Sequence, residues 1–240
     1  MEESTQIAGA SRSALWKPGW LLKRSFFEGP PELVAPRLLG KILARRTRAG
    51  WLAGRIVEAE AYLGPHNDPP DPAAHTYRGP TPRNGVMFGP AGYSYVYAIY
   101  GRYFCMNVSC EIEGRGSGVL LRALEPLAGP DDKGLVRMAR NRGLSLEGIN
   151  PGKMARQIAC GPGRLCQALN ITRESHNGLD LTDPSSPLQM LDDGYPVTEV
   201  LVTARIGIRH AADWPLRFAL PGNNCVSGPK SLTGKRVLIG

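Results

Sequence analysis

The sequence YSYVYAIYGRYFCMN spans Tyr93–Asn107 and holds five of the eight tyrosines of the chain. Its first three tyrosines alternate with small or apolar residues, and this period of two predicts a half-buried strand. Gly101 then marks a turn, and a second strand is expected to start near Tyr103. The stretch therefore predicts a β-hairpin around which the other elements can be placed.

The tip of this hairpin is expected to present Tyr100, Arg102 and Tyr103 to solvent. Aromatic rings stack on nucleic-acid bases and a guanidinium pairs with phosphate, so this combination suits a flat, anionic partner. An ordinary aromatic hairpin packed in a core explains the same residues. The choice between the two interpretations depends on the rest of the chain.

Composition and charge narrow the classes of partner. With 240 residues, 42% hydrophobic and 21% charged, the chain is typical of one globular domain. Its net charge of +8 favours an anionic partner. Residues 1–55 contain ten Lys and Arg against four Asp and Glu, and residues 133–173 contain eight against one. Such blocks suit a groove wall that neutralises phosphates, although solvated faces have a similar composition.

Several classes of protein are disfavoured. No stretch approaches the roughly 18 apolar residues of a membrane span, and the N-terminus lacks the apolar core of a signal peptide. We therefore expect a cytoplasmic protein, associated with the nucleoid if bacterial and nuclear if eukaryotic, with no membrane partner. Residues 1–20 show no periodic pattern and predict a flexible N-terminal arm ahead of one domain over residues 21–240. The five cysteines and four histidines lack metal-ligand spacings, so free thiols and no metal are expected.

Periodicity and turn residues predict the other elements. A helix is expected over Glu28–Gly40, although Pro36 should kink or split it. Gly64–Pro82 is a long Gly- and Pro-rich loop of the kind that is often functional. Two more helices are expected, at Asp131–Arg142 and Gly161–Leu169. Further strands are expected at Lys41–Thr47, Trp51–Glu60, Val119–Leu124, Val197–Ile208, Arg217–Leu220 and Arg236–Ile239.

One strand carries unusual polar side chains. Alternation places Glu58, Glu60 and Tyr62 on one face of an otherwise apolar strand, where they must face water, a partner or an active site. The solvent side of an edge strand is the plainer interpretation of the two carboxylates. Arg122 lies inside another apolar strand, and a buried arginine needs an anionic partner such as Glu58, Glu60 or a phosphate.

Seven motifs together resemble the alkyladenine, or 3-methyladenine, DNA glycosylase family, and the likeness runs from about Leu33 to Ser227. They are RIVEAEAYLGP (55–65), AAHTYRGPTPRN (73–84), MFGPAGYSYVYAIYGRYFCMNVS (87–109), VLLRALEP (119–126), GPGRLCQALNIT (161–172), HNGLDL (176–181) and RIGIRHAADWPLRFALPGN (205–223). The resemblance implies a mixed α/β (α+β) single domain, with a curved antiparallel β-sheet core flanked by helices and a protruding β-hairpin. It also implies a monomer that acts, without cofactor, on double-stranded DNA containing damaged purines.

The resemblance carries site residues with it. Glu60 is similar to the general base that activates water, and Arg122 to its neighbour in the water site. The base pocket is implied to be walled by Tyr62, His75 and Tyr97, with Asn107 rejecting the guanine amino group. Tyr100 resembles the wedge that fills the gap left by a flipped nucleotide. Apart from the resemblance, the hairpin tip and the long loop before it predict further DNA contacts by Arg78, Arg83, Arg102 and Tyr103.

The residues taken by themselves agree with this chemistry. An alkylated purine is electron-poor, so stacking between tyrosine rings favours it over normal bases. As the glycosidic bond breaks the sugar becomes cationic, and a nearby carboxylate stabilises it while taking a proton from water. No lysine lies between Lys41 and Lys133, so water rather than an amine is expected to attack, leaving an abasic site in an intact strand. A non-catalytic nucleic-acid-binding module and a hydrolase of free nucleosides are the alternatives.

Overall fold

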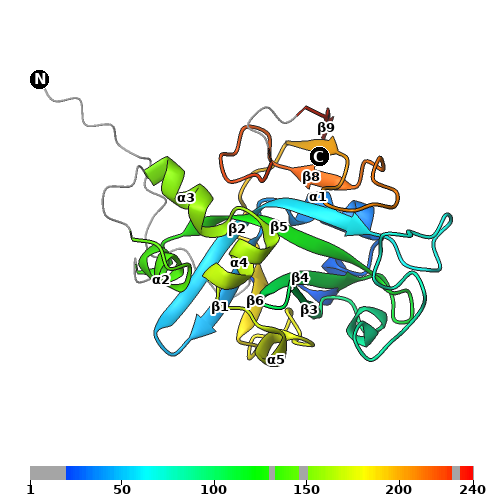
Figure 1. Ribbon diagram of the computed structural model, residues 1–240, viewed down its shortest axis with the longest axis horizontal. Coiled ribbons are helices and arrows are strands. Elements are labelled where there is room, and N and C mark those ends of the chain that lie inside the picture. Colours follow the sequence, from blue (N-terminus) through cyan, green and yellow to red (C-terminus); the bar gives the residue numbers. More distant parts are fainter. Residues whose placement is uncertain (1–19, 130–132, 146–150, 229–232, 240) are drawn as a thin grey trace, which may run out of the picture.

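The computed structural model describes residues 20–129, 133–145, 151–228 and 233–239. In these ranges nine strands form one antiparallel sheet with five helices packed around it (Figure 1). The strands are β1 (Ile42–Thr47), β2 (Gly50–Tyr62), β3 (Ser94–Ile99), β4 (Tyr103–Cys110), β5 (Ser117–Leu127), β6 (Leu188–Leu191), β7 (Glu199–Thr203), β8 (Arg217–Ala219) and β9 (Lys235–Leu238). The helices are α1 (Pro31–Leu38), α2 (Gly134–Asn141), α3 (Pro151–Ala159), α4 (Pro162–Ala168) and α5 (Arg173–His176). The predicted α+β class is confirmed.

Strand β2 lies inside the sheet rather than at its edge. The strand order is β3-β4-β5-β2-β8-β7-β9, and β1 also pairs with β2 and with β6. Along β2, one side pairs with β5 from Ala53 to Tyr62, and the other pairs first with β1 and then with β8. Glu58 and Glu60 are both fully buried on this strand. The edge-strand interpretation is therefore wrong, because pairing partners distant in the chain enclose both sides of β2.

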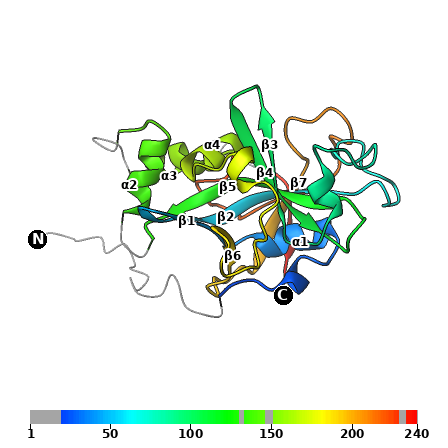
Figure 2. The same ribbon diagram turned by 90° about the horizontal axis from the view of Figure 1, so that it is seen from below.

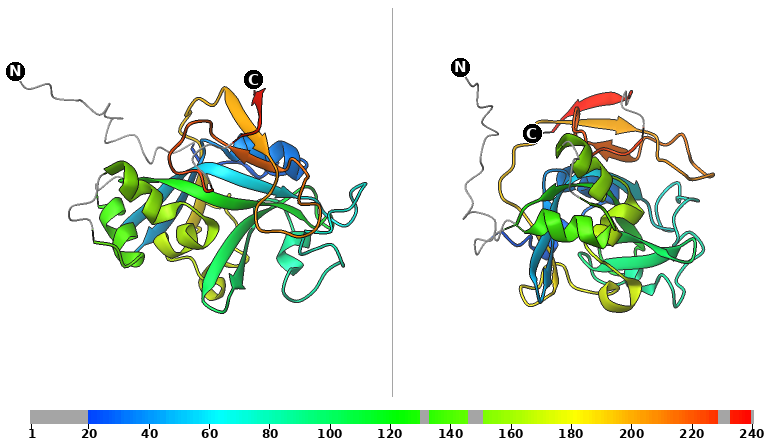
Figure 3. Two further views of the ribbon diagram at one scale, coloured as in Figure 1. Left: turned by 45° about the horizontal axis from the view of Figure 1, so that its top comes forward. Right: turned by 60° about the vertical axis from the view of Figure 1, so that its left-hand side comes forward.

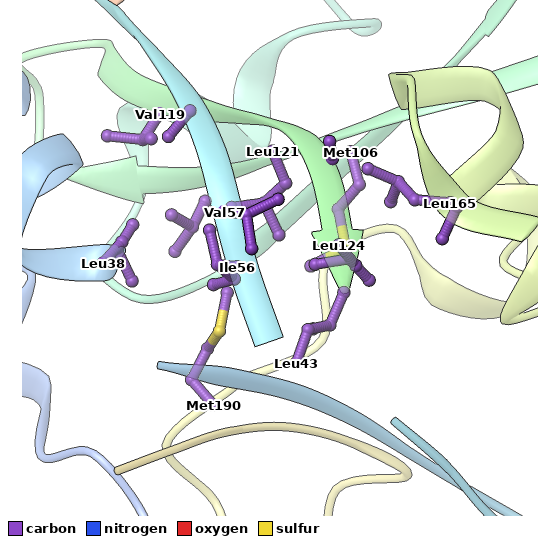
Figure 4. Packing of buried hydrophobic residues seen from close by; sticks show 14 of the residues in the cluster. Leu38, Leu43, Ile56, Val57, Met106, Val119, Leu121, Leu124, Leu165 and Met190 are labelled. Carbon is purple, nitrogen blue, oxygen red and sulfur yellow. The ribbon is translucent and has the colours of Figure 1, made fainter. Parts of the chain in front are cut away.

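The core fills both faces of the long β2–β5 pair. Leu38 of α1 packs on one side and Leu165 of α4 on the other, with Ile56, Val57 and Leu121 between them (Figure 4). All five side chains are fully buried, and each contributes roughly 1.5–3 kcal/mol relative to an exposed one. This packing makes β2 and β5 a rigid base for the side chains that project from their ends.

Helix α1 forms despite the proline inside it. Pro36 removes only one backbone hydrogen bond from an eight-residue helix. Val34 and Leu38 bury one face of that helix, and Gly40 follows its end with φ +84°. Burial of the apolar face offsets the lost hydrogen bond, so α1 continues through Pro36 and is not split in two.

The expectations about the C-terminal half need one correction and two additions. The strand expected over Val197–Ile208 ends at Thr203, and the chain then leaves the sheet through Gly207, which has φ +77°. Strand β6 and helix α3 were not expected from the sequence. The predicted start of α2 at Asp131 lies outside the described residues, as does the proposed arm except for Trp20, so the arm and the division into domains stay predictions.

The tyrosine-rich hairpin is confirmed as β3 and β4, which project from the sheet (Figures 2 and 3). Its ladder ends at the pair Ile99 and Tyr103, and Tyr100 and Gly101 both have positive φ, as a type I′ turn requires. Tyr100 is 91% exposed. All five cysteines are free and buried. Among the described residues, no helix is both long and apolar enough to cross a bilayer.

Candidate active site

Glu60 stands at the end of β2 with hydrogen-bond donors on both carboxylate oxygens. Its Oε2 accepts from the Tyr62 hydroxyl at 2.9 Å and from Arg122 Nη1 at 3.4 Å. Its Oε1 accepts from the backbone N–H of Ile206 at 2.8 Å. The side chain is fully buried, so these donors fix its orientation. The predicted face of alternating polar residues is confirmed, and it points into the protein.

A second carboxylate holds the arginine of this group. Glu58 Oε1 accepts from Arg122 Nε at 2.9 Å, from Arg217 Nε at 2.7 Å and from the Ser227 hydroxyl at 2.8 Å. Burial lowers the pKa of Arg122, but the charges of Glu60 and Glu58 raise it above its ordinary value. The predicted carboxylate partner of Arg122 is confirmed. Arg122 therefore remains a cation, held by Glu58 and directed at Glu60.

A cavity of about 260 Å³ opens next to this group. Five of the residues expected at the site line it: Tyr62, His75, Tyr97, Asn107 and Arg122. They come from four strands, β2 to β5, and from the loop before β3. The fold thus brings together residues spread over sixty positions of the chain.

Aromatic rings form one wall of the cavity. The rings of Tyr95 and Tyr97 stack with centroids 5.3 Å apart, and the rings of His75 and Tyr97 form a T-shaped pair with centroids 4.5 Å apart. His75 Nδ1 lies 3.1 Å from the Tyr95 hydroxyl. Tyr95 was not among the expected site residues, although it shares the period-two face of Tyr97. This wall offers the face of an electron-rich ring to a planar ligand.

The protonation states of the wall follow from their surroundings. Burial raises the pKa of Tyr62 and of Tyr97, so both remain neutral phenols that can donate hydrogen bonds. Partial burial of the ring, helped by the charge of Arg83, lowers the pKa of His75 from 6.5. The imidazole is therefore neutral at pH 7. Among the titrating groups that line the cavity, Arg122 supplies the positive charge.

The remaining predicted residues lie outside the cavity. Tyr100 and Arg102 occupy the exposed hairpin tip, and Tyr103 is 38% exposed beneath it. Arg83 is exposed, with its guanidinium 5.8 Å from the centroid of the Tyr97 ring at the cavity. Arg78 is exposed in the preceding loop and is not among the lining residues. The structure therefore separates an inner group around Glu60 from an outer group of cations and tyrosines.

Helix α4 extends the outer surface on one side of the hairpin. A groove runs between Tyr103 and Gly163, with Gln167 also in its lining. Arg142 and Arg164 lie close enough that the charge of Arg164, after burial, lowers the pKa of Arg142. These arginines belong to the second basic block of the sequence, and Figure 2 shows α2, α3 and α4 grouped beside the projecting hairpin.

The segment after β7 is a part of the site that sequence reasoning did not identify. Ile206, Gly207 and Ile208 line the cavity, and the backbone N–H of Ile206 donates to Glu60. Strand periodicity had placed these residues inside a strand. Gly207 was the available signal, because a glycine within an apparent strand often marks a break.

Comparisons with known proteins identify relatives over nearly the whole chain. A family model described as methylpurine-DNA glycosylase (MPG) matches residues 25–224. A protein of Koribacter versatilis (strain Ellin345) is 50% identical over 211 residues, covering 88% of this chain and 95% of the relative. A protein of Burkholderia lata is 46% identical over 213 residues (88% and 93%), and one of Methanoculleus marisnigri is 45% identical over 210 residues (86% and 98%). All three carry the inferred name 3-methyladenine DNA glycosylase.

Proposed function

The chain belongs to the methylpurine-DNA glycosylase family and is an enzyme of the DNA glycosylase class, and on this premise we propose that it excises alkylated or deaminated purines from duplex DNA by hydrolysis. The observation that carries the proposal is the buried Glu60 carboxylate, joined to Arg122 and Tyr62 at the wall of an aromatic cavity. The proposed partner is double-stranded DNA. The protein is proposed to bind it as a monomer in the cytoplasm. Family membership sets aside the non-catalytic module.

Base flipping explains the separation of the inner and outer groups. A base stacked in a duplex cannot reach a cavity behind the protein surface, so its nucleotide must rotate out of the helix. Tyr100, 91% exposed at the hairpin tip, is the proposed wedge for the vacated space. Ile99, its neighbour in the chain, lines the cavity. The turn therefore joins the wedge directly to the wall that receives the base.

The cavity wall accounts for the proposed preference among purines. Tyr97, backed by Tyr95, offers a π face to an electron-poor base, and cationic bases gain most from such a face. Asn107, 6% exposed on β4, lines the cavity. In that position its amide is proposed to exclude the exocyclic amino group of guanine.

The proposed reaction uses Glu60 as a general base. The glycosidic bond breaks with its electron pair leaving on the base, and the sugar becomes a cation stabilised by the buried carboxylate. A water oxygen bonds to the sugar carbon while Glu60 accepts a proton from that water. The donors Tyr62, Arg122 and Ile206 hold the carboxylate in place throughout.

Incubation of the protein with duplexes containing 7-methylguanine, hypoxanthine or ethenoadenine tests the proposal. We expect base release, strand cleavage only after alkali, and no borohydride-trapped protein–DNA adduct, because no lysine is among the described residues that line the cavity. A lysine from outside the cavity, such as Lys153 on α3, is the alternative nucleophile. An adduct that is lost on mutating one lysine would overturn the hydrolytic mechanism, and absence of base release from every duplex would overturn the function.

Replacing the wedge is expected to weaken flipping. Tyr100 is 91% exposed, so Tyr100→Ser removes a ring that contributes little to packing. The free energy of unfolding should therefore change by less than about 0.5 kcal/mol. We expect lower affinity for the extrahelical state, seen as a smaller fluorescence rise of 2-aminopurine placed beside the lesion. Ile112→Ser, at another exposed apolar position of 69%, is the matched control. An unchanged fluorescence signal in Tyr100→Ser would refute the wedge.

A further inference from the structure

A buried ion pair outside the cavity joins the two loops that form its rim. Asp71 lies in the long loop after β2 and Arg205 in the segment after β7, 134 residues away. Arg205 Nη2 donates to Asp71 Oδ1 at 3.0 Å, and Nη1 donates to Oδ2. Both side chains are completely buried, and neither is among the residues that line the cavity. The pair is therefore placed to hold the rim without meeting a ligand.

Asp71 organises the loop on its own side. Besides Arg205, its Oδ1 accepts from the N–H of Ala73 at 3.0 Å and its Oδ2 from the N–H of Leu63 at 3.2 Å. Ala73, Ala74 and His75 follow directly and form part of the cavity wall. The carboxylate thus fixes both the start of this loop and the part of it that lines the cavity.

Arg205 makes the corresponding contacts to the catalytic group. Its Nη1 donates to the carbonyl of Ala61 at 3.0 Å, and its guanidinium carbon lies 4.6 Å from the centroid of the Tyr62 ring. Tyr62 donates to Glu60 through its hydroxyl. The residue after Arg205 is Ile206, whose N–H donates to the other oxygen of Glu60. Of the three donors to Glu60, the Tyr62 phenol therefore packs against the Arg205 guanidinium, and the Ile206 amide belongs to the peptide bond that follows Arg205.

We propose that the Asp71–Arg205 ion pair positions the Glu60 carboxylate for the reaction, by fixing the Tyr62 phenol and the Ile206 amide. This inference rests on the proposed function. A buried ion pair recovers little net stability once its desolvation is counted, and well-packed apolar residues would hold two loops at least as well. The planar fork of arginine, in contrast, fixes direction: it binds the carboxylate with two parallel bonds and stacks on the tyrosine face. Misplacement of a catalytic group by about 1 Å costs on the order of 100-fold in rate.

The chain contains a matched control for this pair. Arg55 and Asp193 form the same bidentate contact, at 2.8 and 2.7 Å, and Arg55 stacks on Tyr195 at 4.1 Å. Arg55 lies on β2 five residues before Glu60, roughly 16 Å along the strand. Neither member of this pair lines the cavity. It therefore matches the first pair in chemistry, though less completely buried, and differs from it in its distance from the carboxylate.

The test compares Asp71→Asn with Asp193→Asn in single-turnover excision of a lesion that the wild type removes. We expect Asp71→Asn to lower the rate about 10- to 100-fold. The dissociation constant for lesion duplex should stay within about threefold, because both side chains are completely buried and neither lines the cavity. Asp193→Asn is expected to keep both quantities within about threefold of wild type. Melting temperatures of both variants are measured, and rates are compared at a temperature where both are folded.

Arg205→Lys provides a second variant that does not depend on the folding of Asp71→Asn. Lysine keeps the positive charge but lacks the planar fork and the stacking on Tyr62. We therefore expect Arg205→Lys to show a rate loss like that of Asp71→Asn, with a melting temperature closer to that of the wild type. The inference is overturned if Arg205→Lys restores the wild-type rate, or if Asp71→Asn has the rate of Asp193→Asn. Failure of the wild type to excise any modified base is a different outcome, since it would overturn the proposed function itself.

Discussion

Glu60→Gln is expected to lower the single-turnover rate of base excision by about two to four orders of magnitude, the usual contribution of a general base. The amide has nearly the shape of the carboxylate but can neither accept the proton of the attacking water nor stabilise a cationic sugar by its charge. Binding to lesion duplex should remain within a few-fold of wild type. Stopped-time excision assays and fluorescence anisotropy measure the two quantities.

Glu125→Gln is the control for this substitution. Glu125 lies on β5 and accepts from Asn223 Nδ2 at 3.2 Å, a bond that a glutamine oxygen preserves. It is absent from the residues that line the cavity. We expect its rate to match the wild type. A Glu60→Gln rate within about threefold of wild type would show that Glu60 is not the base.

Raising the salt concentration from about 50 to 200 mM is expected to weaken DNA binding by about 10³- to 10⁵-fold if six to ten phosphates are neutralised. The second basic block supports this expectation, because the exposed Arg164 lies on α4, which packs against β4 of the hairpin, and Arg142 lies near Arg164 and Tyr103. Each neutralised phosphate releases counterions, so the logarithm of the binding constant falls by about 0.9 per phosphate for each tenfold rise in salt. Anisotropy titrations with the non-cleaving Glu60→Gln protein give this slope directly.

Single substitutions locate the phosphate contacts. Arg164→Gln, on the helix beside the hairpin, is expected to reduce the salt slope by about one. Arg236→Gln is the matched control, since Arg236 of β9 is also exposed but pairs with Glu199 of β7. Strand β9 lies far from α2 and α4 (Figure 1). Arg236→Gln should leave the slope unchanged. A wild-type affinity that does not respond to salt would instead favour a hydrolase of free nucleosides.

Short-range patterns in the sequence were sufficient for the hairpin and for the polar face of β2. Alternation along Tyr93–Asn107, with Gly101 between its halves, predicted β3, β4 and the exposed Tyr100, because strand direction and turn geometry depend on adjacent residues. The same rule placed Glu58, Glu60 and Tyr62 together. The roles of these residues came from a different source, namely the resemblance of long motifs to a family.

Whether that polar face meets water or the interior was decided only by tertiary structure. The alternation of Glu58 and Glu60 is the same on an edge strand and on a central one. Burial followed from the pairing of β2 with β5 and with β8, which begins at Arg217. Arg122 likewise acquired its carboxylate partners, 64 and 62 residues away in the chain, through the pairing of β2 with β5. The residues next to Glu58, Glu60 and Arg122 in the sequence do not distinguish burial from exposure, because the free energy that favours burial comes from contacts between distant segments.

The segment after β7 shows the same limit most clearly. Its sequence favours a strand through Ile208, yet the chain turns away after Thr203. The buried carboxylate of Asp71 binds Arg205 there, and the Glu60 carboxylate binds the next amide. Strand propensity is a weak preference of adjacent residues, whereas a buried charge left without its partner costs about 3–5 kcal/mol. Sequence periodicity therefore determined which side chains share a face, and contacts between distant residues determined which of those faces became the walls of the cavity.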